Sequence, residues 1–191
     1  MQNRFYSVLL GEDNMLKDYV KFRDIDVSRI EQYKGRLPEE LFDFWREFGL
    51  GTFYNGYLKA IDPNEYIELV QQSYFDGEVT IPIFATAFGD IITWEDNKYI
   101  GILKYRYQDS DIISTGFEDF FEEVEEGVLD DDYFTIKKYN AAVKKYGELE
   151  YDECFGYVPL LALGGKESVK SLKKVKMREH IALIAELTDG I

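Results

Sequence analysis

The densest run of apolar side chains lies in residues 37–62 and predicts the helix around which the rest of the chain packs. Pro38 suits the first turn of a helix, because its missing N–H would have no partner there. The apolar residues that follow are Leu41, Phe42, Phe44, Trp45 and Phe48. Helical geometry gathers them on one broad face, opposite the charged residues. Gly49 accepts the left-handed conformation that ends many helices, so we predict a helix over residues 38–48.

Similar spacing predicts further helices along the chain. Asp26 or Ser28 can cap a short helix that reaches Tyr33, and Asp62-Pro63 can begin another that reaches Tyr74. The other predicted helices cover residues 16–22, 117–126, 133–146 and 177–187. The run Asp130-Asp131-Asp132 is expected to cap and charge-match the helix over residues 133–146.

The middle of the chain predicts strands over residues 57–61, 80–88, 91–94 and 99–107, with residues 111–114 as a possible extension. Gly89-Asp90 and Asp96-Asn97 are short turn sequences, so three of these strands form an antiparallel meander. Pro82 indicates an edge strand or the beginning of a strand. The pattern of residues 168–176 is compatible with a strand or with a turn. The fold class is therefore α+β, with a mostly antiparallel sheet flanked by helices.

Two domain organisations are compatible with this pattern. A boundary near residues 73–79 would separate a helical part, residues 1–75, from an α+β part, residues 76–191. A single intertwined domain fits equally well, and no repeat or linker decides between them.

Composition narrows the class of protein. The chain has 191 residues, of which 46% are hydrophobic and 16% aromatic, as expected for a folded globular protein. No apolar run approaches the length of a membrane span, and the first residues do not resemble a signal peptide. Cys154 is the one cysteine, which excludes an internal disulfide and fits a reducing cytoplasm. A buried thiol explains this residue better than a catalytic one.

Charge is the strongest compositional feature, because 37 acidic residues outnumber 22 basic ones and give a net charge of −15. The excess is concentrated in residues 64–165, which carry 22 acidic and seven basic residues. Such a surface repels phosphate backbones and anionic membranes, so we expect no direct binding of nucleic acid or membrane. A basic protein partner would be attracted, although simple solubility explains the charge as well.

Candidate catalytic chemistry is sparse. Gly164-Gly165-Lys166 lacks the spacing of a phosphate-binding loop, and His180 is the one histidine, which excludes a two-histidine metal site. We expect His180 to be a half-buried packing residue. Asp130-Asp131-Asp132 lacks the ligand spacing of a calcium loop. We therefore predict no catalytic residue, no metal site and no cofactor.

The acidic run at residues 118–132 is the best candidate for a binding surface, because nine of its fifteen residues are acidic and none is basic. Phe117, Phe120, Phe121 and Val124 are expected to face the core, which leaves the carboxylates in solvent. The predicted partner-binding residues are Glu118, Asp119, Glu122, Glu123, Glu126, Asp130, Asp131 and Asp132. The alternative is that these residues are no more than a solvated helix face.

Several segments together resemble a known family. They are residues 37–66, residues 82–95 followed by YIGILKYRY, and the ending that contains YVPLLALGG and LKKVKMREHIALIAELTDG. This order is similar to a GAD-like domain joined to the C-terminal domain of type VI secretion immunity proteins, which are in turn similar to SUKH immunity proteins. The resemblance covers nearly the whole chain and carries packing and turn motifs, not catalytic ones. It implies a non-enzymatic bacterial cytoplasmic protein that binds and neutralises a secreted toxin, often a DNase.

Three hypotheses follow. In the first, the chain presents its acidic surface to a basic toxin, expected to be a nuclease, and blocks the active site. In the second, it is a non-catalytic regulatory scaffold of the same fold that binds an endogenous partner. The third is a hydrolase that uses carboxylates of residues 118–132, and it lacks an evident nucleophile. The sequence does not determine the oligomeric state.

Overall fold

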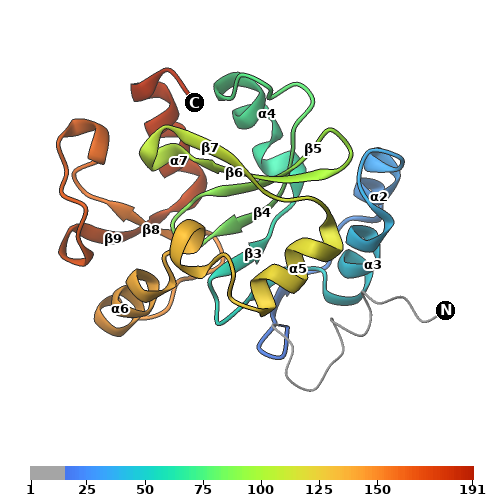
Figure 1. The fold of residues 1–191 in the computed structure, drawn as a ribbon, viewed down its shortest axis with the longest axis horizontal. Coiled ribbons are helices and arrows are strands. Elements are labelled where there is room, and N and C mark those ends of the chain that lie inside the picture. Colours follow the sequence, from blue (N-terminus) through green and yellow to red (C-terminus); the bar gives the residue numbers. More distant parts are fainter. Residues whose placement is uncertain (1–15) are drawn as a thin grey trace.

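A seven-stranded antiparallel sheet forms the centre of the molecule in the computed structural model, which describes residues 16–191 (Figure 1). The strands follow one another in the sheet in the order in which they occur in the sequence. They are β1 (Val20–Arg23), β2 (Leu50–Phe53), β3 (Leu58–Ala60), β4 (Ile81–Thr86), β5 (Ile91–Glu95), β6 (Tyr99–Lys104) and β7 (Asp109–Ser114). The predicted α+β class and the antiparallel meander are confirmed.

Tight turns join the strands of the meander, as predicted. Asp96 and Asn97, between β5 and β6, have φ values of 51° and 54°, a conformation that these residue types tolerate. Pro82 is the second residue of β4, next to a register irregularity in the pairing with β5. The prediction that Pro82 lies near a strand beginning is confirmed. The edge-strand alternative is wrong, because β4 lies between β3 and β5.

Helices cover both faces of the sheet. They are α2 (Val27–Tyr33), α3 (Glu39–Phe48), α4 (Pro63–Ser73), α5 (Phe117–Glu125), α6 (Ile136–Tyr146) and α7 (Met177–Thr188). The two caps predicted at the start of α2 and α4 are present, because the Asp26 and Asp62 carboxylates accept hydrogen bonds from the backbone N–H groups of Ser28 and Asn64.

Alternate residues of β4 divide the core into two layers. Phe84 packs with the buried side chains of α3 and α5, whereas the next residue, Ala85, belongs to the layer formed with α4 and α7. The aromatic layer is dense, since the Phe84 ring centroid lies 5.8 Å from that of Phe44 and 5.9 Å from that of Phe121. The predicted central helix is confirmed as α3, which packs together with α5 on one face of the sheet.

Some local predictions are wrong. Residues 16–22 do not form a helix; β1 lies there instead, and the side chains of Val20 and Phe22 are exposed. Phe22 stacks on Tyr151 with ring centroids 4.2 Å apart. Asp130–Phe134 form a π-helical turn, η2, so the aspartates do not cap α6, which begins after Thr135 in a left-handed conformation.

A separate two-stranded hairpin pairs β8 (Glu153–Tyr157) with β9 (Leu172–Lys176). The open choice for residues 168–176 is thus settled as a 3-10 turn, Val169–Ser171, followed by β9. The sheet contains strands from both sides of residues 73–79, and the division into residues 1–75 and 76–191 stays a prediction. None of the described helices is long and apolar enough to cross a membrane.

Candidate functional site

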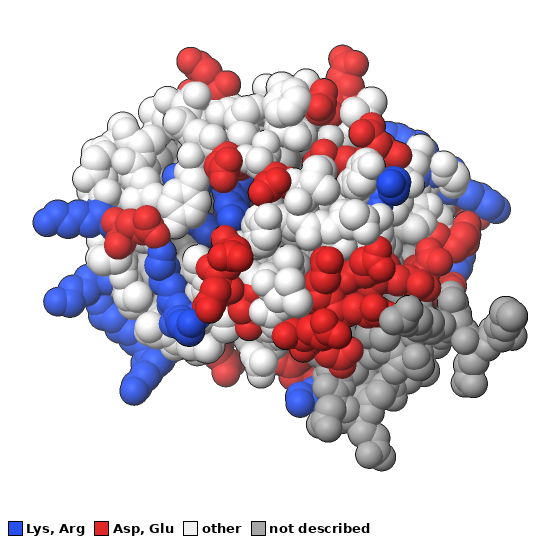
Figure 2. All heavy atoms as spheres, in the orientation of Figure 1, with Lys and Arg blue, Asp and Glu red and all other residues white. Residues whose placement is uncertain are grey.

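Helix α5 is amphipathic, and its two faces have opposite chemistry. Phe117, Phe120, Phe121 and Val124 are buried against the sheet and α3, as predicted. Their burial fixes the rotation of the helix and turns the carboxylates outward. In Figure 2, acidic side chains gather on the face where α5 lies in Figure 1. We call α5 and η2 with their carboxylates the acidic surface; its members are Glu118, Asp119, Glu122, Glu123, Glu125, Glu126, Asp130, Asp131 and Asp132.

The predicted binding residues differ in how freely they face solvent. Asp119, Glu126, Asp131 and Asp132 are exposed, whereas Glu118, Glu122, Glu123 and Asp130 are half-buried. Some already have partners, because Glu122 interacts elsewhere in the chain. Most of the predicted residues therefore lie on one accessible surface, but not all of them are equally available to a partner.

The aspartates of η2 are held by neighbouring elements. The Tyr54 hydroxyl donates a hydrogen bond of 2.7 Å to Asp130, and Lys137 Nζ lies 2.8 Å from an oxygen of Asp131. The Asp131–Lys137 pair is largely exposed and contributes little to stability. These contacts connect Asp130 to Tyr54, which lies between β2 and β3, and Asp131 to α6, whereas Asp132 is exposed.

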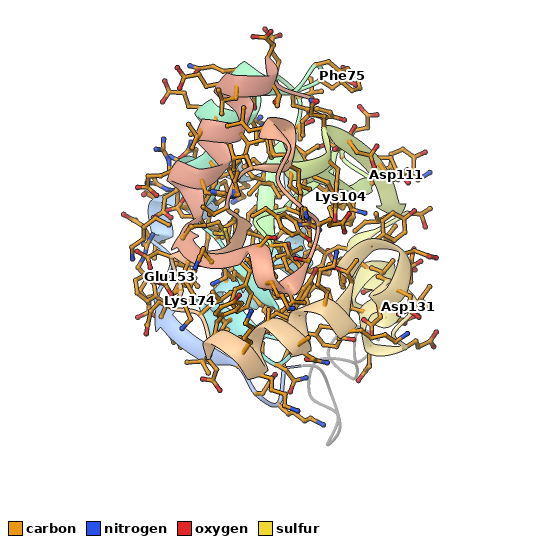
Figure 3. All side chains as sticks on the ribbon, turned by 90° about the vertical axis from the view of Figure 1, so that its left-hand side faces the viewer. Phe75, Lys104, Asp111, Asp131, Glu153 and Lys174 are labelled. Carbon is orange, nitrogen blue, oxygen red and sulfur yellow. The ribbon has the colours of Figure 1, made fainter. Side chains whose placement is uncertain are left out.

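Sequence reasoning missed the contribution of β7 to this face. Asp109 and Asp111 are exposed on β7, which is an edge strand of the sheet. The Tyr133 hydroxyl of η2 donates a hydrogen bond of 3.1 Å to Asp111, which brings the strand and the turn together. Figure 3 shows Asp111 and Asp131 on the same side of the molecule. The two residues of this hydrogen bond are 22 positions apart, so the contact exists only in the folded chain.

The C-terminal end of α5 carries acidic side chains, although the helix dipole disfavours negative charge at that end. Glu125 and Glu126 lie at the C-terminal end, next to the partial negative charge of the helix dipole. Glu125 is exposed, yet the slight loss of solvent around its carboxylate raises its pKa, and the carboxylates of Glu122 and Glu126 raise it further. Each effect disfavours the ionised form of Glu125, and a nearby positive group would favour that form.

Groups capable of other chemistry are separated from the acidic surface or buried. The Cys154 thiol is fully buried, and burial raises its pKa to about 12, so it is not a reactive thiolate. His180 is half-buried beside Gly156, as predicted, and burial lowers its pKa. Arg106 is buried in an ion pair with Asp90, with 2.6 Å between Nη1 and Oδ1. Among residues 16–191, no group of three or more His, Cys, Asp and Glu side chains is placed to hold a metal ion.

Comparisons with known proteins identify the class of this protein. Residues 7–105 match the GAD-like domain, and the chain belongs to this family. Residues 114–188 match the family described as T6SS immunity protein Tdi1, C-terminal. The predicted combination of a GAD-like domain with a type VI immunity domain is thereby confirmed, and immunity proteins of this kind are typically non-catalytic.

A solved structure shares the fold. The crystal structure of Atu4351 from Agrobacterium tumefaciens is 20% identical to this chain, with a TM-score of 0.73. The similarity covers 92% of this chain and 88% of the other. A comparison with curated proteins found no match.

Proposed function

We propose that this protein is a type VI secretion immunity protein that acts in the cytoplasm by binding a basic effector, a nuclease, and covering its active site. The family match of residues 114–188 supports the immunity role. The acidic surface supports the choice of a basic partner, because a nuclease that binds the phosphate backbone presents positive charge at its active site. No bond is made or broken in this mechanism. The effector is inhibited because its substrate cannot reach it.

Occlusion requires affinity as well as charge. An immunity protein must remain bound at low effector concentrations, so we expect a nanomolar complex, roughly −12 kcal/mol. Long-range attraction between the acidic surface and a basic effector mainly raises the rate of association, and this effect weakens as salt screens the charges. A salt-dependent association rate is therefore the measurable consequence of the proposed mode of binding.

The first experiment is co-purification with the product of the neighbouring gene. We expect a stable complex that abolishes the toxicity of that product when both are expressed together. Recovery of endogenous housekeeping proteins alone would support the regulatory scaffold instead.

The second experiment tests the surface. Glu125→Lys, Glu126→Lys and Asp132→Lys reverse three exposed carboxylates of the acidic surface. A matched variant, Glu68→Lys, Glu78→Lys and Glu186→Lys, makes the same change in net charge at exposed positions elsewhere on the molecule. We expect the first variant to lower the association rate with the captured effector at least tenfold at low salt. Equal effects of the two variants would show that net charge matters and the acidic surface does not.

A further inference from the structure

β7 is one of the two edge strands of the seven-stranded sheet, and no strand among the described residues pairs with its outer side. An edge strand presents backbone N–H and C=O groups that can pair with another chain. The other edge strand, β1, has four residues, and its charged side chains Lys21 and Arg23 are basic and already form ion pairs. β7 has six residues, and its charged side chains, Asp109 and Asp111, are acidic and exposed. Of the two edges, β7 is therefore the one that suits a basic partner.

The hydrogen bond of the Ile112 N–H shows which backbone groups of β7 point outward. This N–H donates to the exposed carboxylate of Asp111 at 2.8 Å, so it is directed away from β6. In an antiparallel pair, residues that exchange hydrogen bonds with the neighbouring strand alternate with residues whose backbone groups point to the other side. The backbone groups of Ser110 and Ile112 therefore face the open edge. No helix or loop within residues 16–191 makes a backbone–backbone hydrogen bond to either residue.

The side chains of β7 alternate between the two faces of the sheet. Asp111 lies opposite Ile102, which belongs to the core layer formed with α3 and α5, so Asp109 and Asp111 lie on the same face as the acidic surface. Figure 3 shows Asp111 near the outer margin of the molecule. Neither aspartate forms an ion pair with the described residues. Ile112, on the other face, is 43% exposed. The open edge thus combines unpaired backbone groups with carboxylates on one face and an apolar side chain on the other.

We infer that β7 pairs with an extended segment of the basic effector, which joins the sheet as a further antiparallel strand. The backbone groups of Ser110 and Ile112 supply the hydrogen bonds, and alternate side chains of the added strand lie beside those of β7. Basic residues at every second position then meet Asp109 and Asp111, and β-branched residues between them cover Ile112. This inference rests on the proposed function and names the mode in which the effector is bound. The acidic surface attracts the effector, and the edge strand fixes its position.

A peptide with this alternation tests the inference on the parent protein. The probe is acetyl-Thr-Lys-Val-Lys-Val-Thr-amide, titrated into the ¹⁵N-labelled protein at low salt. We expect saturable shifts of the Ser110 and Ile112 amide signals, and hydrogen exchange of both N–H groups that is at least about fivefold slower in the saturated complex. Exchange of the Asp109 and Asp111 amides, which face β6, is expected to change little. The peptide with glutamate in place of lysine is expected not to bind.

N-methylation of the peptide separates strand pairing from simple attraction of charge. In the antiparallel pair the valines lie opposite Ser110 and Ile112, so their N–H groups point toward β7 and the lysine N–H groups point away from it. Methylation of both valine nitrogens is expected to abolish saturable binding, whereas methylation of both lysine nitrogens is expected to leave the Kd within about threefold. Equal binding by the two methylated peptides, or unmoved Ser110 and Ile112 signals, overturns the inference.

Two variants at one position test the edge from the side of the protein. Ile112→Pro removes the outward N–H, and an edge strand tolerates proline where the N–H faces solvent. Ile112→Thr keeps the N–H and the β-branched shape. We expect Ile112→Pro to weaken peptide binding at least about tenfold and Ile112→Thr to weaken it less than about threefold. Equal binding by the two variants overturns the inference.

A second copy of the chain is the competing occupant of this edge. β9 also alternates basic and apolar residues, at Lys174-Val175-Lys176. Sedimentation of the free protein at low and high salt tests this alternative, and we expect a monomer under both conditions. A dimer that dissociates at high salt and is lost in Ile112→Pro would assign the edge to a second copy and overturn the inference.

Failure of this inference can be told apart from failure of the proposed function. If a captured effector binds Ile112→Pro as tightly as the parent, β7 is not the site of pairing and the immunity role stands. If no effector is captured at all, the immunity role fails, and the peptide titration still decides whether β7 accepts a basic strand.

Discussion

At the scale of single residues, Gly35 and Gly49 both adopt a positive φ, but only Gly49 is also closely packed against other backbone atoms. Gly49 ends α3 with a φ of 72°, as the sequence predicts. Its position is also crowded, because an added Cβ would lie 2.6 Å from the carbonyl oxygen of Arg23 and 3.2 Å from Cα of Asp24. Gly35 has a similar φ of 75°, but no atom lies within 4 Å of a Cβ built there. The sequence predicts the end of the helix at Gly49. It does not predict that the end of β1 packs closely against Gly49.

We predict that Gly49→Ala destabilises the protein considerably more than Gly35→Ala. Both substitutions place a Cβ on a residue with positive φ, which costs about 1 kcal/mol or more. Gly49→Ala additionally pushes against backbone atoms, which raises the expected loss to about 3 kcal/mol. Urea unfolding of the two variants measures the difference. Equal losses would mean that β1 can move away from Gly49 at no cost.

Lys59 gives a prediction about pH. It is fully buried on β3, its Nζ donates to the carbonyls of Glu150 and Tyr151 at 2.8 and 2.9 Å, and burial lowers its pKa to about 8. Because the folded-state pKa is below the unfolded value of about 10.5, protonation favours unfolding, and stability falls as pH decreases from about 10 to about 8. Relative to Lys59→Met, the parent is expected to lose on the order of 3 kcal/mol across this interval and to change little below it. Denaturant unfolding from pH 7 to 10 measures this difference, and a constant difference contradicts the prediction.

At the scale of elements, the sequence predicts those whose signals are local. Helices α3, α4 and α5 have strong apolar spacing or recognisable ends, and the meander of β4, β5 and β6 has short turns between apolar strands. The missed elements depend on distant partners. β1 is a strand because Val20 pairs with Thr52 of β2, and β8 because it pairs with β9. Long-range pairing leaves no local pattern in such short strands.

The packing of α3 and α5 on the sheet gives a prediction at this scale. Phe84 of β4 is fully buried and contacts aromatic rings of both helices. Phe84→Ala is expected to reduce the free energy of unfolding by about 3–5 kcal/mol, because it leaves a cavity between the two helices and the sheet. Phe75→Ala, at a side chain that is 75% exposed, is expected to cost less than about 0.5 kcal/mol. A comparable loss in both variants would indicate that the aromatic layer is not tightly packed.

At the scale of the whole molecule, charge is unevenly distributed. In Figure 2, acidic side chains gather on the face where α5 lies in Figure 1, whereas basic side chains protrude at the left. The sequence predicts the acidic surface itself, because the apolar face of α5 fixes which side chains point outward. It does not predict that Asp111 of the edge strand β7 lies beside η2, since the two meet only in the folded chain.

The arrangement of charge on α5 predicts a conflict between stability and binding. Glu125 and Glu126 oppose the helix dipole and repel the neighbouring carboxylates, so a protein selected for stability alone would place lysine there. We therefore expect Glu125→Lys, Glu126→Lys, Asp132→Lys to raise the melting temperature at 20 mM NaCl by about 2–4 °C, which corresponds to roughly 1 kcal/mol. The matched variant Glu68→Lys, Glu78→Lys, Glu186→Lys should raise it less, because its positions lie outside the dense cluster. The difference should disappear at 500 mM NaCl, where charges more than a few ångströms apart are screened. Calorimetry at both salt concentrations measures these melting temperatures. If the acidic-surface variant is more stable than the parent yet binds its effector poorly, the carboxylates are retained for recognition. If the variant is less stable than the parent, the carboxylates support the fold.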